Sequence, residues 1–462
     1  MEPNYDAIVI GSGQAGPFLA VRLAKAGLKT VLIERQHLGG TCVNDGCIPT
    51  KTMVASARSA YMARRAAEFG VVIDGAVRVD LRALKGRKDR IVAQSVDGLA
   101  TWIGGTPGLD VVFGHARFVS AHAVEVGGAV LQAPKIFINV GGRATVPQWS
   151  GIDTVPVLDN TSIMELDELP EHLIVVGGSY IGLEFAQMFR RFGSQVTVLE
   201  AADRLLARED AEVGAGVQAM LEREGVVFRL GVREAQVGMS TNGIRVACDS
   251  SGGTQEVIGS HLLAAVGRRP NTDDLGLQHA GIAIDARGYI VVDDQLRTNV
   301  DSVWALGDVN GRGAFTHTAY NDHEIVAANL LEGGSRRVSD RIPVYALFTD
   351  PPLGRIGMSE AEVRATGRPA LVGVMPMTRV GRARERGETK GFMNVLVDAQ
   401  TERILGASLL CIDGDEIVHS LLLAMAAGIS YRIIQQTMHI HPTVGELIPT
   451  LLGELAPLKE SA

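Results

Sequence analysis

The feature that most constrains the fold is a short strand, a glycine-rich turn and a helix, an arrangement that the chain contains twice. In the first copy the apolar strand Asp6–Ile10 leads into the turn GSGQAG, whose glycines are Gly11, Gly13 and Gly16, and a helical pattern follows to Ala26. The first glycine permits the tight turn, the second lets the backbone approach a pyrophosphate at the helix N-terminus, and the third allows close packing of helix and strand. This unit therefore predicts a dinucleotide site.

The second copy begins 166 residues later (177 − 11). The strand Leu173–Val176 precedes the turn GGSYIG, which starts at Gly177 and ends at Gly182. Ser179 stands where the middle glycine is expected, and its small side chain leaves slightly less clearance for a phosphate. A doubly wound domain without a nucleotide is the alternative for either unit alone, but two units in one chain favour two different dinucleotides.

Each unit has an acid at the end of its second strand. Glu34 and Glu200 both lie 18 residues after the last glycine of their turn (34 − 16 and 200 − 182). A carboxylate at this place accepts hydrogen bonds from ribose hydroxyls and repels a 2′-phosphate, so Glu200 favours NADH over NADPH. The neighbouring Arg204 and Arg208 are either surface residues, which we favour, or contacts to a 2′-phosphate.

Two cysteines follow the first unit directly. Cys42 and Cys47 lie in the run GGTCVNDGCIPTK, in which Lys51 and a helix start after Pro49 are expected to lower thiol pKa values and favour a thiolate. One Cys-x4-Cys lacks the second ligand pair of structural zinc sites. The pattern predicts a redox pair beside a nucleotide, although two unbridged cysteines remain the alternative because a disulfide requires Cα atoms within about 7 Å.

The other two cysteines, Cys248 and Cys411, are expected to be ordinary thiols, since four cysteines in 462 residues make no disulfide framework. Near the C-terminus His441 is followed five residues later by Glu446. A histidine oriented by a carboxylate can move a proton near neutral pH. A histidine is most often structural when it stands alone, but together with the upstream dithiol His441 becomes a plausible acid–base partner.

Bulk properties exclude several classes of protein. A chain of 462 residues is expected to form about three domains, and its net charge of −8 argues against a nucleic-acid partner. We find no run of 18 apolar residues and no signal segment before the first strand, so we expect a cytoplasmic protein without a membrane span.

Together these motifs resemble the pyridine nucleotide-disulfide oxidoreductases, FAD enzymes that include dihydrolipoamide dehydrogenase, glutathione reductase and mercuric reductase. The resemblance covers essentially the whole chain, with further landmarks at 114–118, 138–147, 267–271 and 305–308. Within the family the chain is most similar to the RclA-like branch, which is linked to reactive chlorine and copper stress. The segments that carry this likeness are 207–210, 350–358 and 406–411.

The resemblance implies a role for each motif. The FAD would be bound by Gly11, Gly13, Gly16, Glu34, Thr41, Lys51, Ala116, Gly141 and Asp308. The NAD(P)H would be bound by Gly177, Ser179, Tyr180, Gly182, Glu200 and Gly267, with the Tyr180 ring covering the nicotinamide pocket until NADH enters.

The resemblance also orders the catalytic groups. Cys47 would exchange electrons with the flavin, the more outward Cys42 would attack the substrate, and Lys51 would pair with Glu184. His441 and Glu446 would reach the disulfide of the opposite subunit, which implies an obligate homodimer.

The expected fold is α/β, with two Rossmann-like dinucleotide-binding domains and a C-terminal α+β dimerisation domain. We expect an FAD-binding domain from residues 1–150 and the return segment 271–342, an NAD(P)H-binding domain from 151–270, and a dimerisation domain from 343–462. The usual Ala-Thr-Gly before the second domain is replaced by Asn139-Val140-Gly141-Gly142, which keeps Gly141 for close approach.

The expected activity is transfer of electrons from NADH through FAD to Cys42 and Cys47, and on to an oxidant such as Cu(II) or another thiophilic metal ion. No structural metal is expected, and a substrate metal would bind only transiently at Cys42 and Cys47. A dedicated mercuric reductase is disfavoured because the sequence lacks the C-terminal cysteine pair of those enzymes. Dihydrolipoamide dehydrogenase and a non-catalytic flavoprotein redox sensor are the alternatives.

Overall fold

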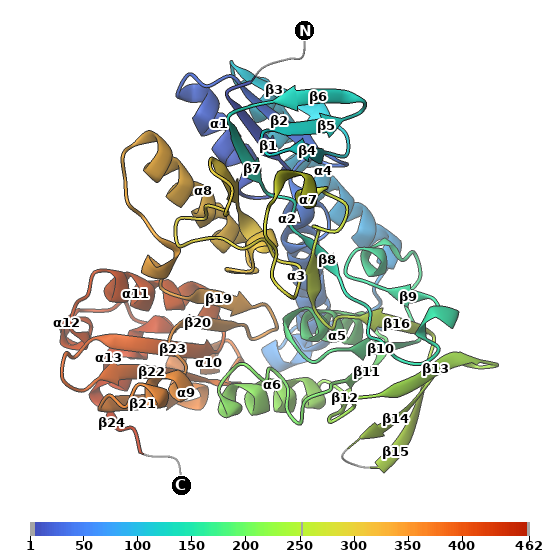
Figure 1. Cartoon of the computed structure of the whole chain (residues 1–462). Coiled ribbons are helices and arrows are strands. Elements are labelled where there is room, and N and C mark those ends of the chain that lie inside the picture. The colour runs from blue at the N-terminus through green and yellow to red at the C-terminus, as the bar shows by residue number, and fades with distance from the viewer. Residues whose placement is uncertain (1–4, 251–252, 460–462) are drawn as a thin grey trace.

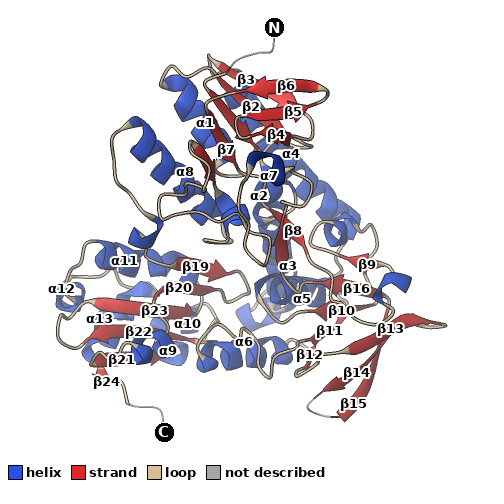
Figure 2. Ribbon diagram, viewed as in Figure 1, coloured by secondary structure: helices blue, strands red, loops and turns tan. Residues whose placement is uncertain are grey.

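The structure is a computed structural model that describes residues 5–250 and 253–459. Three sheets of five or six strands carry the architecture, of which two are parallel and one is antiparallel. In Figure 1 the first parallel sheet lies at the top, the second at the lower right and the antiparallel sheet at the lower left. Figure 2 shows helices against all three sheets. The expected α/β class with a separate C-terminal domain is confirmed.

The first parallel sheet is built mainly from the N-terminal part of the chain. Its central strand β1 (Ala7–Ile10) is apolar and buried, and pairs with β2 (Thr30–Glu34) and β7 (Lys135–Ile138). The edges are β3 (Leu109–Phe113) and β18 (Val303–Ala305). Because β18 follows the second parallel sheet in sequence, the chain returns to complete the first.

The second parallel sheet repeats this arrangement around β10 (His172–Val176), whose last four residues are buried. A run buried on both faces is typical of a central strand in a doubly wound sheet. The other strands are β9 (Val157–Leu158), β11 (Gln195–Leu199), β12 (Val226–Arg229) and β16 (His261–Ala264).

The C-terminal sheet is antiparallel and has the strand order β19-β20-β23-β22-β21-β24. Its strands β20, β22 and β23 are largely buried, so the sheet forms the centre of a third hydrophobic core. The bounds are β19 Val344–Leu347, β20 Leu353–Gly357, β21 Ala370–Pro376, β22 Phe392–Asp398, β23 Ile404–Leu410 and β24 Ala456–Pro457.

Smaller sheets and the helices complete the fold. The remaining strands are β4 Arg117–Ser120, β5 Ala123–Val126, β6 Ala129–Gln132, β8 Gly142–Ala144, β13 Ala235–Ser240, β14 Gly243–Ser250, β15 Gly253–Gly259 and β17 Arg268–Pro270. The helices are α1 Gly16–Lys25, α2 Gly40–Asn44, α3 Cys47–Arg64, α4 Leu81–Gly104, α5 Tyr180–Phe192, α6 Ala211–Arg223, α7 Leu277–Ala280, α8 Thr316–Leu331, α9 Glu360–Ala365, α10 Gly381–Glu385, α11 Gly414–Ala426, α12 Tyr431–Gln436 and α13 Ile448–Gly453.

The helix α3 begins earlier than the sequence suggested. We expected its start after Pro49, but the helix starts at Cys47. Proline is tolerated in the first turn of a helix because an N–H there has no intrahelical acceptor. Cys47 is therefore the first residue of α3, where the positive end of the helix dipole favours an anion.

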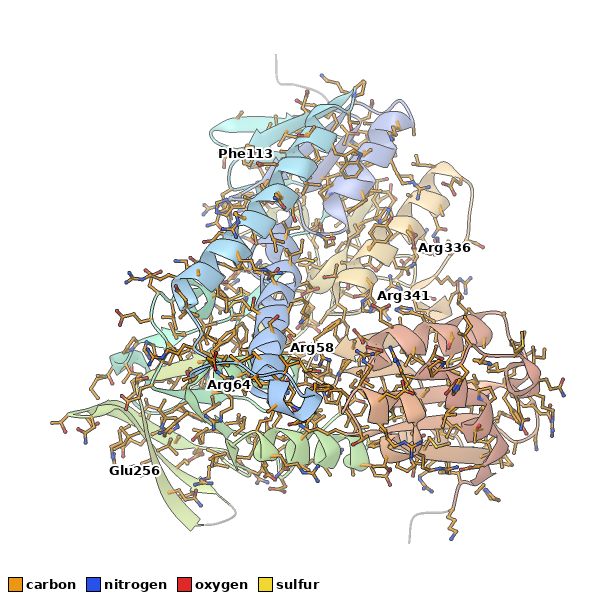
Figure 3. All side chains as sticks on the ribbon, turned by 180° about the vertical axis from the view of Figure 1, so that it is seen from behind. Arg58, Arg64, Phe113, Glu256, Arg336 and Arg341 are labelled. Carbon is orange, nitrogen blue, oxygen red and sulfur yellow. The ribbon has the colours of Figure 1, made fainter. Side chains whose placement is uncertain are left out.

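The same helix joins the three parts of the chain. Arg58 forms an ion pair with Asp350, which precedes β20, and Arg64 donates a hydrogen bond to the backbone oxygen of Arg191 in α5. Figure 3 shows Arg58 and Arg64 along α3, seen from behind. These contacts fix the C-terminal half of α3, at the end opposite Cys47, relative to the second parallel sheet and the C-terminal domain.

Candidate active site

The two cysteines of the predicted redox pair lie at the junction of two helices. Cys42 is in the short helix α2, Cys47 begins α3, and both are free thiols. Cys47 Sγ lies 3.0 Å from Oγ1 of Thr316, the first residue of α8. No sequence pattern indicated this contact, since Thr316 is 269 residues away and belongs to no motif.

The surroundings shift the pKa values of the two thiols in opposite directions. A hydrogen bond from Cys42 lowers the pKa of Cys47 to about 6, helped by Thr316 and by the positive charge of Lys51, although burial acts in the opposite direction. The pKa of Cys42 is raised, first because its thiol donates that hydrogen bond and then by burial. Cys47 is therefore the thiolate of the pair near neutral pH.

Lys51 and Glu184 lie directly beside the thiols. Lys51 Nζ is 2.5 Å from Glu184 Oε2, and the other carboxylate oxygen accepts a hydrogen bond of 3.0 Å from the backbone N–H of Phe348. Lys51 Nζ also lies 4.5 Å from the centre of the Phe348 ring. The C-terminal domain thereby supports an ion pair between α3 and α5.

A cavity opens beside the first glycine-rich turn. Of the predicted FAD-binding residues, it is lined by Gly11, Gly13, Glu34, Thr41, Ala116 and Gly141. A Cβ added at Gly141 would meet no protein atom within 4 Å, so this glycine faces open space. Gly16 instead packs against the turn, because its Cβ would lie 2.1 Å from the Gly11 oxygen.

The Glu34 carboxylate is hydrogen-bonded to the first glycine-rich turn. Its Oε2 accepts hydrogen bonds from the Ser12 N–H at 2.9 Å and from the Ser12 hydroxyl at 2.6 Å, while Oε1 accepts one from the Gln36 N–H at 2.8 Å. The carboxylate is thus oriented at the cavity wall, as a ribose-binding acid requires. A cavity wall that contains glycines and an oriented acid fits a dinucleotide such as FAD.

Asn139, which follows β7, contacts this turn, and sequence reasoning missed its role. Its Oδ1 accepts a hydrogen bond of 2.9 Å from the Gly16 N–H, and its Nδ2 donates one of 2.9 Å to the Leu306 oxygen. The side chain is buried. Its departure from the usual Ala-Thr-Gly was the available signal, and the structure shows that it joins the turn to the return segment.

Asp308 belongs to the short 3-10 helix 307–310 in that return segment. Burial raises the pKa of its carboxyl group, and the positive charge of Arg268 opposes the shift. Asp308 does not line the cavity beside the first turn. Arg268 does line it, with a hydrogen bond to the Gly142 oxygen.

The second glycine-rich turn has the same packing as the first. A Cβ on Gly182 would lie 2.0 Å from the Gly177 oxygen, and the Glu200 Oε2 accepts a hydrogen bond of 2.5 Å from the Gly178 N–H. Ser179 is exposed and precedes the first residue of α5. At Gly267, with φ of +123°, an added Cβ would meet no protein atom within 4 Å. Both turns are therefore built alike.

The Arg204 guanidinium is hydrogen-bonded to backbone oxygens of its own loop. Its guanidinium donates hydrogen bonds to the Glu209 oxygen at 2.8 Å and to the Ala207 oxygen at 2.7 Å. This arrangement favours a structural role for Arg204 over the alternative contact to a 2′-phosphate.

Tyr180 is the first residue of α5, and its ring is packed edge-on against Phe315 and Tyr345 at centroid distances of 6.2 and 5.9 Å. Its hydroxyl donates a hydrogen bond of 2.5 Å to Glu209. Burial and the Glu209 charge raise the pKa of the phenol well above its usual value, so Tyr180 stays protonated.

His441 lies apart from the thiols within the single chain. Its Nδ1 is 2.8 Å from Glu446 Oε2, yet 81% of its side chain is exposed. Among the described residues, neither Cys42 nor Cys47 forms a hydrogen bond or ion pair with His441. The nearby Met438 and Ile440 are exposed by 95% and 80%, so this edge of the C-terminal domain exposes apolar side chains.

Residues 5–250 and 253–459 contain neither of two features that would indicate other functions. In this part of the chain no helix is both long and apolar enough to cross a membrane. Nor do three histidine, cysteine or acidic side chains come together there as a metal site.

Comparisons with known proteins agree with this geometry. A family model described as pyridine nucleotide-disulphide oxidoreductase matches residues 5–322, and the dimerisation domain of that family matches residues 344–452. The chain is 39% identical to the probable pyridine nucleotide-disulfide oxidoreductase RclA of Escherichia coli over 97% of its own length and 99% of the relative.

Other similar proteins are named for different activities. A mercuric reductase of Streptomyces lividans is 34% identical, with 96% of this chain and 95% of the relative covered. A dihydrolipoyl dehydrogenase of Chlamydia muridarum is 32% identical, with coverage of 97% and 96%. A solved Cu(II) complex of the HOCl-induced flavoprotein disulfide reductase RclA from Escherichia coli has a TM-score of 0.88 at 38% identity and covers 98% of this chain and 99% of that one.

Proposed function

The chain belongs to the pyridine nucleotide-disulphide oxidoreductase family of flavoprotein enzymes, which use FAD and NAD(P)H, and from this premise we propose that it passes electrons from NADH to Cys42 and Cys47 and on to a thiophilic metal ion such as Cu(II). The observation that carries the proposal is Cys47 at the start of α3, with a thiol pKa of about 6 and Cys42 as its hydrogen-bonding partner. Family membership favours an enzyme over a redox sensor.

In this proposal residues 1–150 and 271–342 form the FAD-binding domain, 151–270 the NAD(P)H-binding domain and 343–462 the dimerisation domain. FAD would lie against Gly11, Gly13 and Gly141, with its ribose at Glu34. When bound, FAD supplies hydride acceptance from NADH and two-electron exchange with the cysteine pair. The protein holds this cofactor by glycines that admit its backbone contacts and by an acid oriented before it binds.

NADH would bind at the second turn, with Glu200 at the adenosine ribose. The Glu200 carboxylate is fixed by the Gly178 N–H, and Arg204 is held by its own loop, so the site offers a negative rather than a positive group to the 2′ position. This charge favours NADH, while NADPH would meet repulsion from the acid.

The cysteine pair would supply both ligands and electrons to a soft metal ion. When the Cys47 thiolate and the Cys42 thiol form the Cys42–Cys47 disulfide, they release two electrons and the one proton of Cys42. The two electrons reduce two Cu(II) ions to two Cu(I) ions. Support for copper comes from the similarity to RclA, for which a Cu(II) complex is solved.

The Lys51–Glu184 ion pair would place a positive ammonium group near the Cys47 sulfur. Its ammonium group lowers the pKa of Cys47, so the thiolate persists at neutral pH. His441, oriented by Glu446, would complete the site of the partner subunit in a homodimer, which the family's dimerisation domain indicates. There it would hold the proton that Cys42 gives up.

Dihydrolipoamide oxidation is the second candidate, and the His441–Glu446 pair is the observation that favours it. A dithiol substrate must lose protons to a base before it can attack a disulfide, whereas a metal ion has no proton to give. A neutral His441, hydrogen-bonded through Nδ1, leaves Nε2 as such a base.

The test is steady-state NADH oxidation by the purified flavoprotein with Cu(II), Hg(II), lipoamide or glutathione disulfide as oxidant. The decisive variant is Cys42→Ala, and the matched control is Cys248→Ala, which removes a buried thiol from β14 in the small sheet. Metal-dependent turnover that disappears in Cys42→Ala and persists in Cys248→Ala supports the proposal. Fast lipoamide turnover with slow metal reduction would instead establish dihydrolipoamide dehydrogenase activity.

A further inference from the structure

Two tyrosines from different parts of the fold share one carboxylate oxygen. Tyr180 donates a hydrogen bond of 2.5 Å to Glu209 Oε1, and Tyr345 donates one of 2.7 Å to the same atom. Tyr180 begins α5 of the second parallel sheet, whereas Tyr345 lies in β19 of the C-terminal sheet. Glu209 comes from the loop before α6, so three separate segments meet at this oxygen.

The carboxylate itself is buried and only partly satisfied. Glu209 is 3% exposed, and within the described part of the chain its Oε2 has no hydrogen-bond partner. The nearest positive group is Arg355 Nε, 3.4 Å from Oε2, and this N–H also lacks a hydrogen bond there. Arg355 is 2% exposed in β20. A buried carboxylate with one oxygen that accepts no hydrogen bond depends strongly on the donors that remain.

The two tyrosines differ in their freedom to move. The Tyr345 ring is stacked on Phe315 at 5.3 Å with an interplanar angle of 3°, and Phe315 is stacked in turn on His317 at 5.3 Å. The Tyr180 ring meets the rings of Phe315 and Tyr345 edge-on and is stacked on neither, while its hydroxyl is also hydrogen-bonded with that of Tyr345. His317 Nε2 donates a hydrogen bond to the Val344 oxygen, which ties this stack to β19, beside α8 in Figure 1. Tyr345 is therefore the fixed donor and Tyr180 the movable one.

We propose that Glu209 is the latch of the nicotinamide pocket: it holds the Tyr180 ring closed through the phenol hydroxyl, and Tyr345 keeps the carboxylate hydrogen-bonded when Tyr180 swings away. The inference rests on the proposed function, in which Tyr180 covers that pocket. Glu209 and Tyr345 are positioning residues, since they act on the nucleotide through Tyr180.

Loss of the Tyr180 hydroxyl and loss of the Tyr345 hydroxyl should have opposite effects on nicotinamide binding. Closure keeps the pocket in a state that excludes nicotinamide, so the apparent affinity for NAD⁺ equals the intrinsic affinity multiplied by the fraction of molecules that are open. Loss of the Tyr180 hydroxyl removes the bond that favours closure. Loss of the Tyr345 hydroxyl leaves an opened Glu209 without either phenol, so opening becomes harder.

The experiment is equilibrium binding to the oxidised flavoprotein by titration calorimetry, with NAD⁺ and ADP-ribose as probes. ADP-ribose carries the adenosine and both phosphates but no nicotinamide, so it occupies the nucleotide site without displacing Tyr180. The variants are Tyr180→Phe and Tyr345→Phe, each of which keeps its ring and loses one hydroxyl bonded to Glu209.

We expect Tyr180→Phe to bind NAD⁺ about tenfold more tightly, and Tyr345→Phe to bind it about tenfold more weakly. ADP-ribose should bind all three proteins within about twofold, which also shows that each variant is folded. Because the two predicted shifts have opposite signs, general damage to the pocket cannot produce both.

Three outcomes would overturn the latch. These are shifts of NAD⁺ affinity in the same direction in both variants, equal shifts for ADP-ribose and NAD⁺, or no shift at all. Failure of the wild-type protein to bind either probe is a different result, because it would reject the proposed nucleotide site itself. If one variant does not fold, the sign of the NAD⁺ shift in the other still decides the proposal.

Discussion

Lys51 and Glu184 form a 2.5 Å ion pair, and each lies one helical turn after the residue that opens its helix, Cys47 for α3 and Tyr180 for α5. Side chains four residues apart lie on one helix face. The pair therefore joins the proposed thiolate and the proposed gate residue through two rigid helices.

The ionisation of Cys47 should depend on Lys51. Above its pKa of about 6 the thiol is deprotonated, so the rate of alkylation by iodoacetamide should rise as pH increases through 6. In Lys51→Met the midpoint should move up by roughly 0.5–1 pH unit, since the ammonium group is lost and Glu184 disfavours the thiolate.

The control for this measurement is Lys85→Met, which removes an ammonium group from α4 that pairs with Glu165. The double variant Lys51→Met with Glu184→Gln should recover part of the shift, because the opposing negative charge is also gone. A midpoint that stays near 6 in Lys51→Met would contradict a contribution of Lys51.

Thr316 should stabilise the same thiolate by hydrogen bonding. Thr316→Val keeps the shape of the side chain and removes the hydroxyl 3.0 Å from Cys47 Sγ. The alkylation midpoint should rise by roughly 0.5–1 pH unit, as expected for one lost hydrogen bond to an anion. Thr101→Val, which removes an exposed hydroxyl of α4 bonded to the Asp97 oxygen, is the control and should leave the midpoint unchanged.

Asn139 should stabilise the first nucleotide-binding unit. Asn139→Ala leaves the buried Gly16 N–H and Leu306 oxygen without their partner, and the free energy of unfolding should fall by about 2–4 kcal/mol. Urea denaturation of the flavin-free protein measures this loss, and flavin content after purification should fall with it.

Asn299→Ala is the matched control for Asn139→Ala. Asn299 also makes two hydrogen bonds with backbone atoms, of Gly281 and Ala283, but it lies on an exposed loop. Water can replace those bonds, so the loss should stay below about 1 kcal/mol. Equal losses in both variants would argue against a special role for the buried residue.

Mixed dimers should test whether the site is shared between subunits. Cys42→Ala and His441→Ala homodimers should each have low lipoamide activity, whereas a heterodimer of the two contains one site with both native residues if His441 acts across the interface. We expect roughly half the wild-type activity per dimer. The measurement uses differently tagged, co-expressed subunits, and a heterodimer as inactive as its parents would show that both residues serve one subunit.

Several parts of the fold and site were predictable because they are encoded by adjacent residues. The glycine turns at Gly11 and Gly177, with the acids Glu34 and Glu200, follow from local strand, turn and helix patterns. The start of α3 was wrong because proline is compatible with the first turn of a helix, so Pro49 did not mark the boundary.

Other relationships arise only when distant segments pack together. The Thr316 contact to Cys47 spans 269 residues, the Asn139 bond to Gly16 spans 123, and the Tyr345 bond to Glu209 spans 136. None of these residues lies at a periodic position that would reveal its partner.

The sequence by itself determined the two nucleotide-binding units, the cysteine pair and the family, because turn geometry and short spacings are properties of contiguous chain. The tertiary structure decided which thiol ionises and what holds Tyr180 in place. Cys47 depends on Cys42, Thr316 and Lys51, and Tyr180 depends on Glu209. Charges and hydrogen bonds act over a few ångströms in space, and only the packed fold fixes those distances.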